Sequence, residues 1–233
     1  KVQAAQTAHD TATAAVAGKT APNLAELNAQ KNIAQGGIRL TLVKFKKNSG
    51  VPSIPRNKGM EFARGEYLFF MDSDDAITQT AMEELYSVAQ KFPADFLHCE
   101  KFYHVPNAPF TTDKKFFSIS SGEKVEFVTE PTVISQDLAF RVRDYTNRRF
   151  YNPPWVHFIR RDFLAQNNIK FPELGVGDDI IFNFYMLCLA ENIIRIPNIY
   201  YIWRLNTDSN TRAPLPIDKA VHRYGKSIMK AIG

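Results

Sequence analysis

Three aspartates stand within four residues at the end of an apolar run, and their spacing is suited to holding a cation. Residues 66–75 read Glu-Tyr-Leu-Phe-Phe-Met-Asp-Ser-Asp-Asp. Two like charges about 4 Å apart repel by roughly 1 kcal/mol in water and by about 4 kcal/mol at an effective dielectric near 20. A hard divalent cation relieves this repulsion, and Asp72 and Asp74 have the D-x-D spacing in which two carboxylates bracket one ion. We therefore predict an Mg²⁺ or Mn²⁺ site, with a solvated acidic turn as the alternative.

A second acidic pair, Asp178 and Asp179, follows Gly177 and opens a predicted helix over residues 178–191. The N-terminus of a helix favours ionised carboxylates. A carboxylate held there is suited to act as a general base that takes a proton from a hydroxyl group. Simple capping of the helix is the alternative.

Two arginines lie where they could bind an anion. Arg56 comes just before a short helix predicted over residues 57–63, where its fork and the free N–H groups of the helix start could bind a diphosphate. Arg204 begins a polar loop over residues 205–212 that could close over an anionic ligand and exclude water. Ordinary surface positions are the alternative for both.

The elements that position these residues alternate between strands and helices, which indicates a layered α/β domain. The run 68–71 has no polar face, and this pattern is typical of a strand covered on both sides in a mostly parallel sheet. The aspartates would then lie at its C-terminal end, where open α/β sheets bind ligands. The other predicted strands cover residues 38–45, 94–105 and 193–203. The predicted helices of the domain include residues 78–92, 155–167 and 178–191.

The chain of 233 residues is predicted to contain one main domain over residues 38–212. Residues 1–37 form an Ala/Thr/Gln-rich helical segment before it, and residues 213–233 form a basic helix after it. Hydrophobic residues make up 45% of the chain and aromatic residues 12%, which indicates a packed core rather than disorder.

The net charge of +5 comes from dispersed basic residues, among them Arg141, Arg143 and Arg160. This dispersion favours attraction to phosphates or anionic lipid, with possible peripheral membrane association, and argues against a nucleic-acid partner. Only Cys99 and Cys188 occur, which favours a reducing, cytoplasmic compartment, at most at the inner face of the membrane. No apolar run approaches the ~20 residues that span a bilayer, and residues 1–37 have no apolar core of a secretory signal.

Taken in chain order, these segments resemble the family 2, GT-A-fold glycosyltransferases. Two segments are similar to the family's signature before and at its metal site, namely residues 50–59 (Gly-Val-Pro-Ser-Ile-Pro-Arg-Asn-Lys-Gly) and residues 63–75. Similar to its acceptor-side segment and closing loop are residues 158–164, 168–173, 177–179 and 200–204, with Ser209 and Thr211. The ordered combination over roughly residues 38–212 is specific, although each piece alone is not.

The resemblance implies a GT-A-like, mixed and mostly parallel sheet flanked by helices, and a metal-dependent reaction. It assigns donor binding to Arg56, Asn57, Asp72, Asp75, Arg204 and Ser209, and the Mn²⁺ or Mg²⁺ ion to Asp72 and Asp74. The donor would be a nucleotide-diphosphate sugar. The family also implies cell-surface polysaccharide or glycolipid synthesis, with a glycan or glycolipid as the acceptor.

On the acceptor side, the resemblance makes Asp179 the base, with Asp178 where the family usually has Glu. The acceptor hydroxyl would then attack from the face opposite the leaving group, with inversion, and a single base suffices for this. Trp155 could stack on a sugar face and His157 could lie near the acceptor, with core positions as the alternative for both.

The family's usual first strands, which form most of the pocket for base and ribose, are not identifiable in residues 1–37. We therefore expect a fragment, or a chain that lacks those strands or replaces them. Two other functions remain open. One is a metal-dependent phosphatase-like hydrolase in which an aspartate attacks phosphorus; the other is a non-catalytic, degenerate sugar-nucleotide or glycan-binding module.

Overall fold

The computed structural model describes residues 41–105, 115–118, 127–147, 150, 153–174 and 176–204. The chain divides into two compact units between residues 49 and 50, and every described helix and strand belongs to the second unit. Residues 41–45 form no strand, so the prediction for residues 38–45 is wrong over this part; Leu42 and Phe45 are exposed, and no described strand pairs with them. The predicted domain boundaries after residues 37 and 212 lie outside the described residues.

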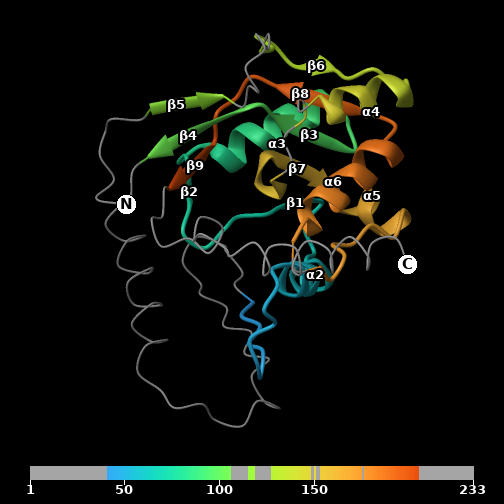
Figure 1. Ribbon diagram of the computed structural model, residues 1–233. Helices are drawn as coiled ribbons and strands as arrows, with labels where there is room; N and C mark the ends of the chain where they lie inside the picture. The colour runs from blue at the N-terminus through green and yellow to red at the C-terminus, as the bar shows by residue number, and fades with distance from the viewer. Residues whose placement is uncertain are drawn as a thin grey trace, which may run out of the picture. The chain divides into compact units, whose positions relative to one another are not determined.

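The described strands form two sheets (Figure 1). The five-stranded sheet has the order β1 (Tyr67–Phe69), β7 (His157–Arg160), β3 (Phe96–Cys99), β8 (Ile193–Ile196) and β6 (Thr132–Val133). The four-stranded sheet has the order β2 (Ala76–Ile77), β9 (Tyr201–Arg204), β4 (Lys101–Val105) and β5 (Lys115–Ser118). Only the pairs β3–β8 and β4–β9 are parallel among these strands. The mixed sheet is confirmed, but its description as mostly parallel is wrong.

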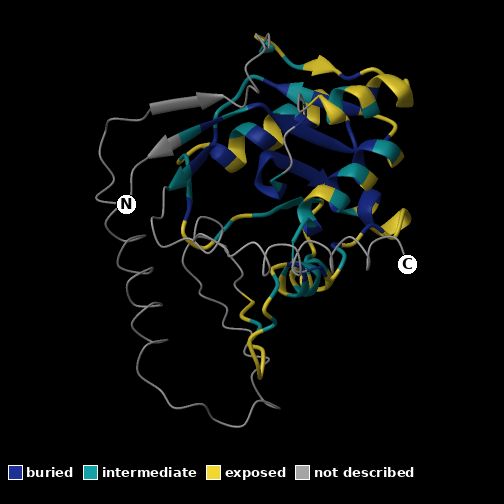
Figure 2. Cartoon of the chain, in the orientation of Figure 1, coloured by how far each residue is buried: buried dark blue, intermediate teal, exposed yellow. Residues whose placement is uncertain are grey.

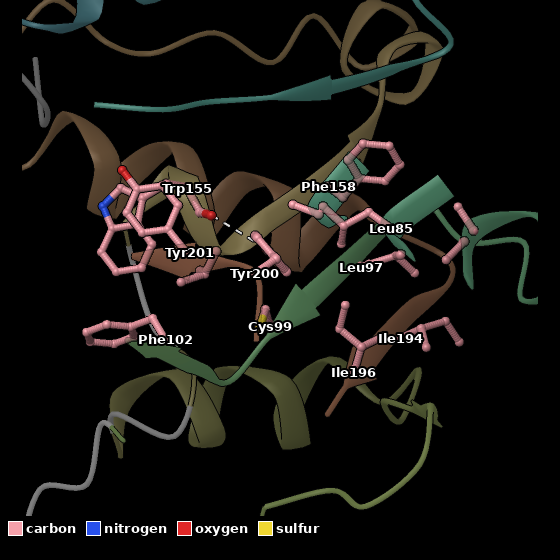
Figure 3. Close-up of a cluster of buried hydrophobic side chains, with 14 residues drawn as sticks. Leu85, Leu97, Cys99, Phe102, Trp155, Phe158, Ile194, Ile196, Tyr200 and Tyr201 are labelled. Atoms are coloured by element: carbon pink, nitrogen blue, oxygen red, sulfur yellow. Dashed lines mark hydrogen bonds between the residues drawn. The ribbon is translucent and has the colours of Figure 1, made fainter. Parts of the chain in front are cut away.

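The central strands of the five-stranded sheet are buried (Figure 2). Their alternate residues belong to two separate cores, so helices cover both faces of the sheet. On β3, Leu97 belongs to the core under α3 (Ala81–Lys91), shown in Figure 3, whereas Phe96 belongs to the core under α5 (Arg161–Gln166) and α6 (Asp178–Leu189). The other helices among the described residues are α2 (Ser53–Phe62), α4 (Leu138–Thr146) and a 3-10 turn over Pro154–Val156. The expected flanked sheet is thus present.

Several predicted elements have different bounds in the structure. The helix predicted over residues 155–167 is the 3-10 turn, β7 and then α5, because β7 lies inside the sheet and pairs with β1 on one side and β3 on the other. The single strands predicted over 94–105 and 193–203 are each divided between the two sheets, as β3 with β4 and as β8 with β9.

The apolar run before the aspartates is only partly buried. Strand β1 lies at an edge of the five-stranded sheet as described, its three residues are half-buried, and Met71 is exposed. It pairs with β7 in the antiparallel direction. The prediction of a strand buried on both faces is therefore wrong, although a strand does lead into Asp72.

No helix in the described ranges is long and apolar enough to cross a bilayer.

Candidate active site

One arginine joins the two acidic motifs that lie 106 positions apart in the sequence. Arg56 Nη2 lies 3.1 Å from Asp72 Oδ1, and Arg56 Nη1 lies 3.5 Å from Asp178 Oδ2. The Arg56 side chain is 17% exposed, Asp72 43% and Asp178 7%. A partly buried guanidinium between two carboxylates offsets their mutual repulsion, so the end of β1 and the start of α6 are held together at one point.

Arg56 belongs to the first turn of α2, because this helix begins at Ser53 and not at Asn57 as the sequence suggested. Pro55 is tolerated there since the first-turn N–H groups have no partners within the helix. The guanidinium also lies over the Phe171 ring, 5.4 Å from its centre. Phe171 in turn stacks on Phe182 of α6 at 3.8 Å. These contacts fix the direction in which the arginine projects.

Asn57 holds the segment that carries Phe171. Its Nδ2 donates to the Phe171 carbonyl at 2.8 Å, and its Oδ1 accepts from the Phe171 N–H at 2.9 Å. Both ends of the amide are therefore used within the protein. Asn57 supports the wall on which Arg56 rests, and its predicted contact with a donor stays a prediction.

A cleft of about 600 Å³ lies beside the Arg56–Asp72 ion pair. Residues of α2, including Arg56, form one wall, and residues 68–73 form the other. A volume of this size lies within the range of small-molecule sites. The cleft therefore brings an arginine and an accessible carboxylate to a space that can hold a nucleotide.

The aspartate loop is tied to strand β9. The Asp75 carboxylate is buried, accepting from the Tyr201 hydroxyl at 2.6 Å and from the Arg204 N–H at 2.8 Å. Arg204 Nε also donates to the Asp74 carbonyl, which places this arginine at the loop. Burial raises the pKa of Asp75 to about 6, while the hydrogen bonds from Tyr201 and Arg204 oppose the rise.

The Asp178 and Asp179 carboxylates lie in the first turn of α6, as predicted. Burial raises the pKa of Asp178, with the Arg56 charge opposing the rise. Burial likewise raises the pKa of Asp179, and a hydrogen bond from the Ile180 N–H opposes it. Asp179 therefore binds a proton more readily than an exposed aspartate, which suits a general base.

The Asp72 carboxylate is half-exposed and Asp74 is exposed, so both can reach an ion. Within the described ranges no cluster of three or more histidine, cysteine or acidic side chains could hold a metal alone. A magnesium site typically takes one or two carboxylates and completes its shell with water and substrate phosphates. The two carboxylates fit such an ion.

The two residues expected on the acceptor side lie in the core instead. Trp155 is 4% exposed and stacks on Tyr201 at 4.1 Å, as Figure 3 shows. His157 is fully buried, 3.4 Å from His98 between their Nδ1 atoms. Strand β7 carries His157 into the sheet, which the helical prediction for 155–167 did not anticipate. Neither ring is accessible to an acceptor in this structure.

The buried histidine pair predicts a steep loss of stability in acid. Burial lowers the pKa of His157 to about 3, so below the ordinary value of 6.5 the unfolded chain binds a proton that the folded chain does not. Stability should then fall by about 1.4 kcal/mol per pH unit from this residue alone. Urea unfolding at pH values from 6.0 to 4.5 measures this loss. The free energy of unfolding of His157→Asn should fall less steeply with decreasing pH than that of the unaltered chain, by about 1.4 kcal/mol per pH unit. Equal slopes of stability against pH in the two proteins would contradict the prediction. The range from pH 7 to 8, where histidine is neutral in both the folded and unfolded chain, serves as the internal control.

Ser209 lies outside the described residues. Tyr201 and Phe171 are the site residues that the sequence reasoning missed. Tyr201 lies three positions before Arg204 on β9, and Phe171 lies in residues 168–173, where the resemblance gave the segment but no role for this residue. Their aromatic character was visible, but the partners that give them a role are more than 100 positions away.

Comparisons with known proteins identify the family and the fold. The model of "Glycosyl transferase family 2" matches residues 26–165. The poly(ribitol-phosphate) beta-N-acetylglucosaminyltransferase TarP of Staphylococcus aureus (strain N315) is 28% identical over 166 residues, covering 69% of this chain and 45% of its own length. The cholesterol galactosyltransferase of Borreliella burgdorferi is 27% identical over 171 residues, covering 66% of this chain and 42% of its own length.

Among solved structures, S. aureus TarS 1–349 in complex with UDP superposes with a TM-score of 0.55 at 23% identity, covering 72% of this chain and 44% of that one. The same protein with UDP-GlcNAc gives a TM-score of 0.55 at 22% identity, covering 75% and 44%. This likeness shows the GT-A fold. The chain spans less than half the length of each of these relatives. Since the family model matches more than half of its 233 residues, the chain belongs to glycosyl transferase family 2.

Proposed function

We propose that this chain transfers a sugar from a nucleoside-diphosphate donor to an acceptor hydroxyl with inversion at the sugar carbon, aided by Mn²⁺ or Mg²⁺. The observation that carries the proposal is the Arg56 bridge, which brings Asp72 at the cleft and Asp178, next to the proposed base, to one place. Relatives solved with UDP and UDP-GlcNAc make these the first ligands to test.

The donor diphosphate binds at the mouth of the cleft in this proposal. Arg56 exchanges Asp72 for the diphosphate oxygens and keeps Asp178 as its partner, and a guanidinium fork is well shaped for a diphosphate. Arg204 contacts the diphosphate from the aspartate loop, where its Nε donates to the Asp74 carbonyl. A bound Mn²⁺ or Mg²⁺ would be held by Asp72 and Asp74 and would supply Lewis-acid stabilisation of the departing diphosphate.

The acceptor approaches from the side of α6 in this proposal. Asp179 accepts the proton of the acceptor hydroxyl as its oxygen attacks the sugar carbon opposite the diphosphate. Asp178 keeps its pairing with the Arg56 region, so the two neighbouring aspartates have different tasks. Burial of the Asp179 carboxylate raises its pKa and increases its affinity for that proton.

Loss of Asp74 should abolish metal-dependent donor binding. Replacing one carboxylate that contacts a cation removes about 4 kcal/mol of attraction at an effective dielectric near 20, or on the order of a thousandfold in affinity. We expect Asp74→Asn to weaken UDP binding in Mn²⁺ by about that factor, measured by titration calorimetry. Glu83→Gln on the exposed face of α3 is the control. Unchanged Mn²⁺-dependent binding by Asp74→Asn would refute the assignment.

The same preparation separates the other candidate functions. A hydrolase of the phosphatase type would release phosphate from aryl phosphates, which a sugar transferase does not do. A non-catalytic module would bind UDP-sugar without turnover. The family match favours transfer, and the release of UDP that depends on an added acceptor would establish it.

The names of the relatives suggest acceptors of the polysaccharide or glycolipid class, since one names poly(ribitol-phosphate) and another names cholesterol. We extend this class to the present chain as a proposal. Peripheral association with an anionic membrane surface, on the cytoplasmic side, belongs to the same proposal and rests on the net charge of +5.

A further inference from the structure

The Tyr201 hydroxyl lies between two residues of the aspartate loop. It donates to Asp75 Oδ2 at 2.6 Å and accepts from the Asp72 N–H at 3.2 Å. The residue is 1% exposed, so both bonds are shielded from water. A single oxygen thus fixes the main chain of the first aspartate and the carboxylate of the last.

The Tyr201 ring itself has little freedom to move. Trp155 stacks against it (Figure 3), with ring centres 4.1 Å apart and planes 6° apart. Phe69 makes an edge contact with the Tyr201 ring at 6.3 Å between ring centres. On the main chain, Tyr201 pairs with Ile77 of β2, the strand that follows the loop. The hydroxyl is therefore held at a fixed point relative to both ends of the loop.

Other bonds restrain the loop from the same strand. The Asp75 N–H donates to the Asp72 carbonyl at 3.2 Å, which closes a tight turn, and the Arg204 N–H donates to Asp75 Oδ1 at 2.8 Å. The Asp72 and Asp74 carboxylates remain at the surface of this turn. Their separation and direction thus depend on how firmly the turn is held from behind.

We propose that Tyr201 is a positioning residue for the donor and metal site, acting through the Asp72 main chain and the Asp75 carboxylate. This inference rests on the proposed function for its catalytic consequence. Tyr201 is too deeply buried to contact a donor and takes no part in the proton transfer assigned to Asp179. Its effect should therefore appear in donor affinity and not in the rate of the chemical step.

The test is Tyr201→Phe, which keeps the stacked ring and removes only the hydroxyl. Loss of one buried hydrogen bond of this kind changes an equilibrium by about five- to tenfold. We expect the KM for UDP-sugar and the dissociation constant for UDP in Mn²⁺ to rise by about that factor, with kcat changed by less than about twofold. Hydrogen exchange at the Asp72 amide, which needs no ligand, should accelerate by a similar factor.

Tyr200→Phe is the matched control. Tyr200 is the neighbouring buried tyrosine, and its hydroxyl approaches the Trp155 carbonyl at 3.5 Å rather than the loop. It should leave both the donor constants and the Asp72 exchange rate unchanged. Equal effects of the two variants would mean general destabilisation and would overturn the proposal, as would an unchanged Asp72 exchange rate in Tyr201→Phe.

A second variant and the ligand-free measurement keep the outcome decisive. Asp75→Asn leaves one acceptor oxygen where the carboxylate accepts from both the Tyr201 hydroxyl and the Arg204 N–H, so it should accelerate exchange at the Asp72 amide even if Tyr201→Phe fails to fold. An unchanged rate in this variant would also overturn the proposal. If the unaltered chain binds no UDP with Mn²⁺, the proposed function fails, whereas the exchange data still decide whether Tyr201 positions the loop.

Discussion

Asp179→Asn is expected to bind UDP in Mn²⁺ as tightly as the unaltered chain and to transfer sugar about 10²- to 10⁴-fold more slowly, the usual contribution of a general base. The amide has nearly the same shape as the carboxylate, and its oxygen can still accept from the Ile180 N–H. It cannot take a proton from the acceptor hydroxyl. Steady-state release of UDP with an added acceptor, together with calorimetric UDP binding, measures both quantities.

Two comparisons sharpen this experiment. Asp162→Asn alters an exposed aspartate in the first turn of α5 and should change neither quantity. Asp178→Asn removes a partner of Arg56 and should act on donor affinity first. If Asp179→Asn transfers sugar at a rate near that of the unaltered chain, Asp179 is not the base. If only Asp178→Asn loses transfer, the base is Asp178.

The pH dependence of transfer should carry the same signature. The base must be ionised to work, and burial raises the pKa of Asp179 above its ordinary value of 3.8. The rate should therefore fall as the pH falls through this raised pKa, at a pH where an exposed aspartate would still be ionised. Raising the pH above it should restore the rate.

The helices that carry strong local signals were predictable from the sequence. The helix predicted over residues 78–92 is observed as α3, and the one predicted over 178–191 is α6, with both aspartates in its first turn. Their buried faces were less predictable, since Met82 and Ile180 are exposed whereas Phe182 and Met186 are buried. The apolar residues of α6 lie on nearly all sides of the helix, so the period of the hydrophobic pattern does not indicate which face is buried.

The strands show where local patterns fail. Residues 157–160 run directly into helix α5, and pairing with β1 and β3 makes them a strand. The short apolar run 68–71 could equally suit a central or an edge position, and the structure places β1 at an edge of the described sheet. In both cases tertiary contacts decide the outcome, as is common for strand propensity.

The motifs of the candidate site were visible in the sequence, but their connections were not. Asp72, Arg56 and Asp178 were each singled out, yet nothing in their spacing indicated that one guanidinium contacts both carboxylates. Asp75 was grouped with the donor-binding residues, whereas the structure buries its carboxylate against Tyr201. The links from Arg56 to Asp178 and from Asp75 to Tyr201 each join residues more than 100 positions apart, which a linear motif does not encode.

Arg141 shows the same limitation most clearly, because it was counted among dispersed basic residues suited to anionic partners and is in fact 2% exposed. Its Nε donates to the Ser135 carbonyl at 2.6 Å, and its Nη2 donates to the Glu191 carbonyl at 3.0 Å. Its Nη1 donates to the carbonyls of Leu187 and Ala190 at 3.2 and 2.5 Å. The cation thus caps the C-terminus of α6, where the helix dipole favours positive charge.

Arg141→Met should therefore destabilise the fold by on the order of 3–5 kcal/mol, because it leaves several buried carbonyls without a donor. Urea unfolding followed by circular dichroism measures the loss as a lower midpoint at an unchanged slope. Arg143→Met is the matched control, since Arg143 lies on the exposed face of α4, the helix that also carries Arg141. This variant should change stability by less than about 1 kcal/mol. Arg141→Lys retains the charge without the planar fork and should fall between the two. A midpoint for Arg141→Met equal to that of the control would show that the C-terminus of α6 needs no buried cation.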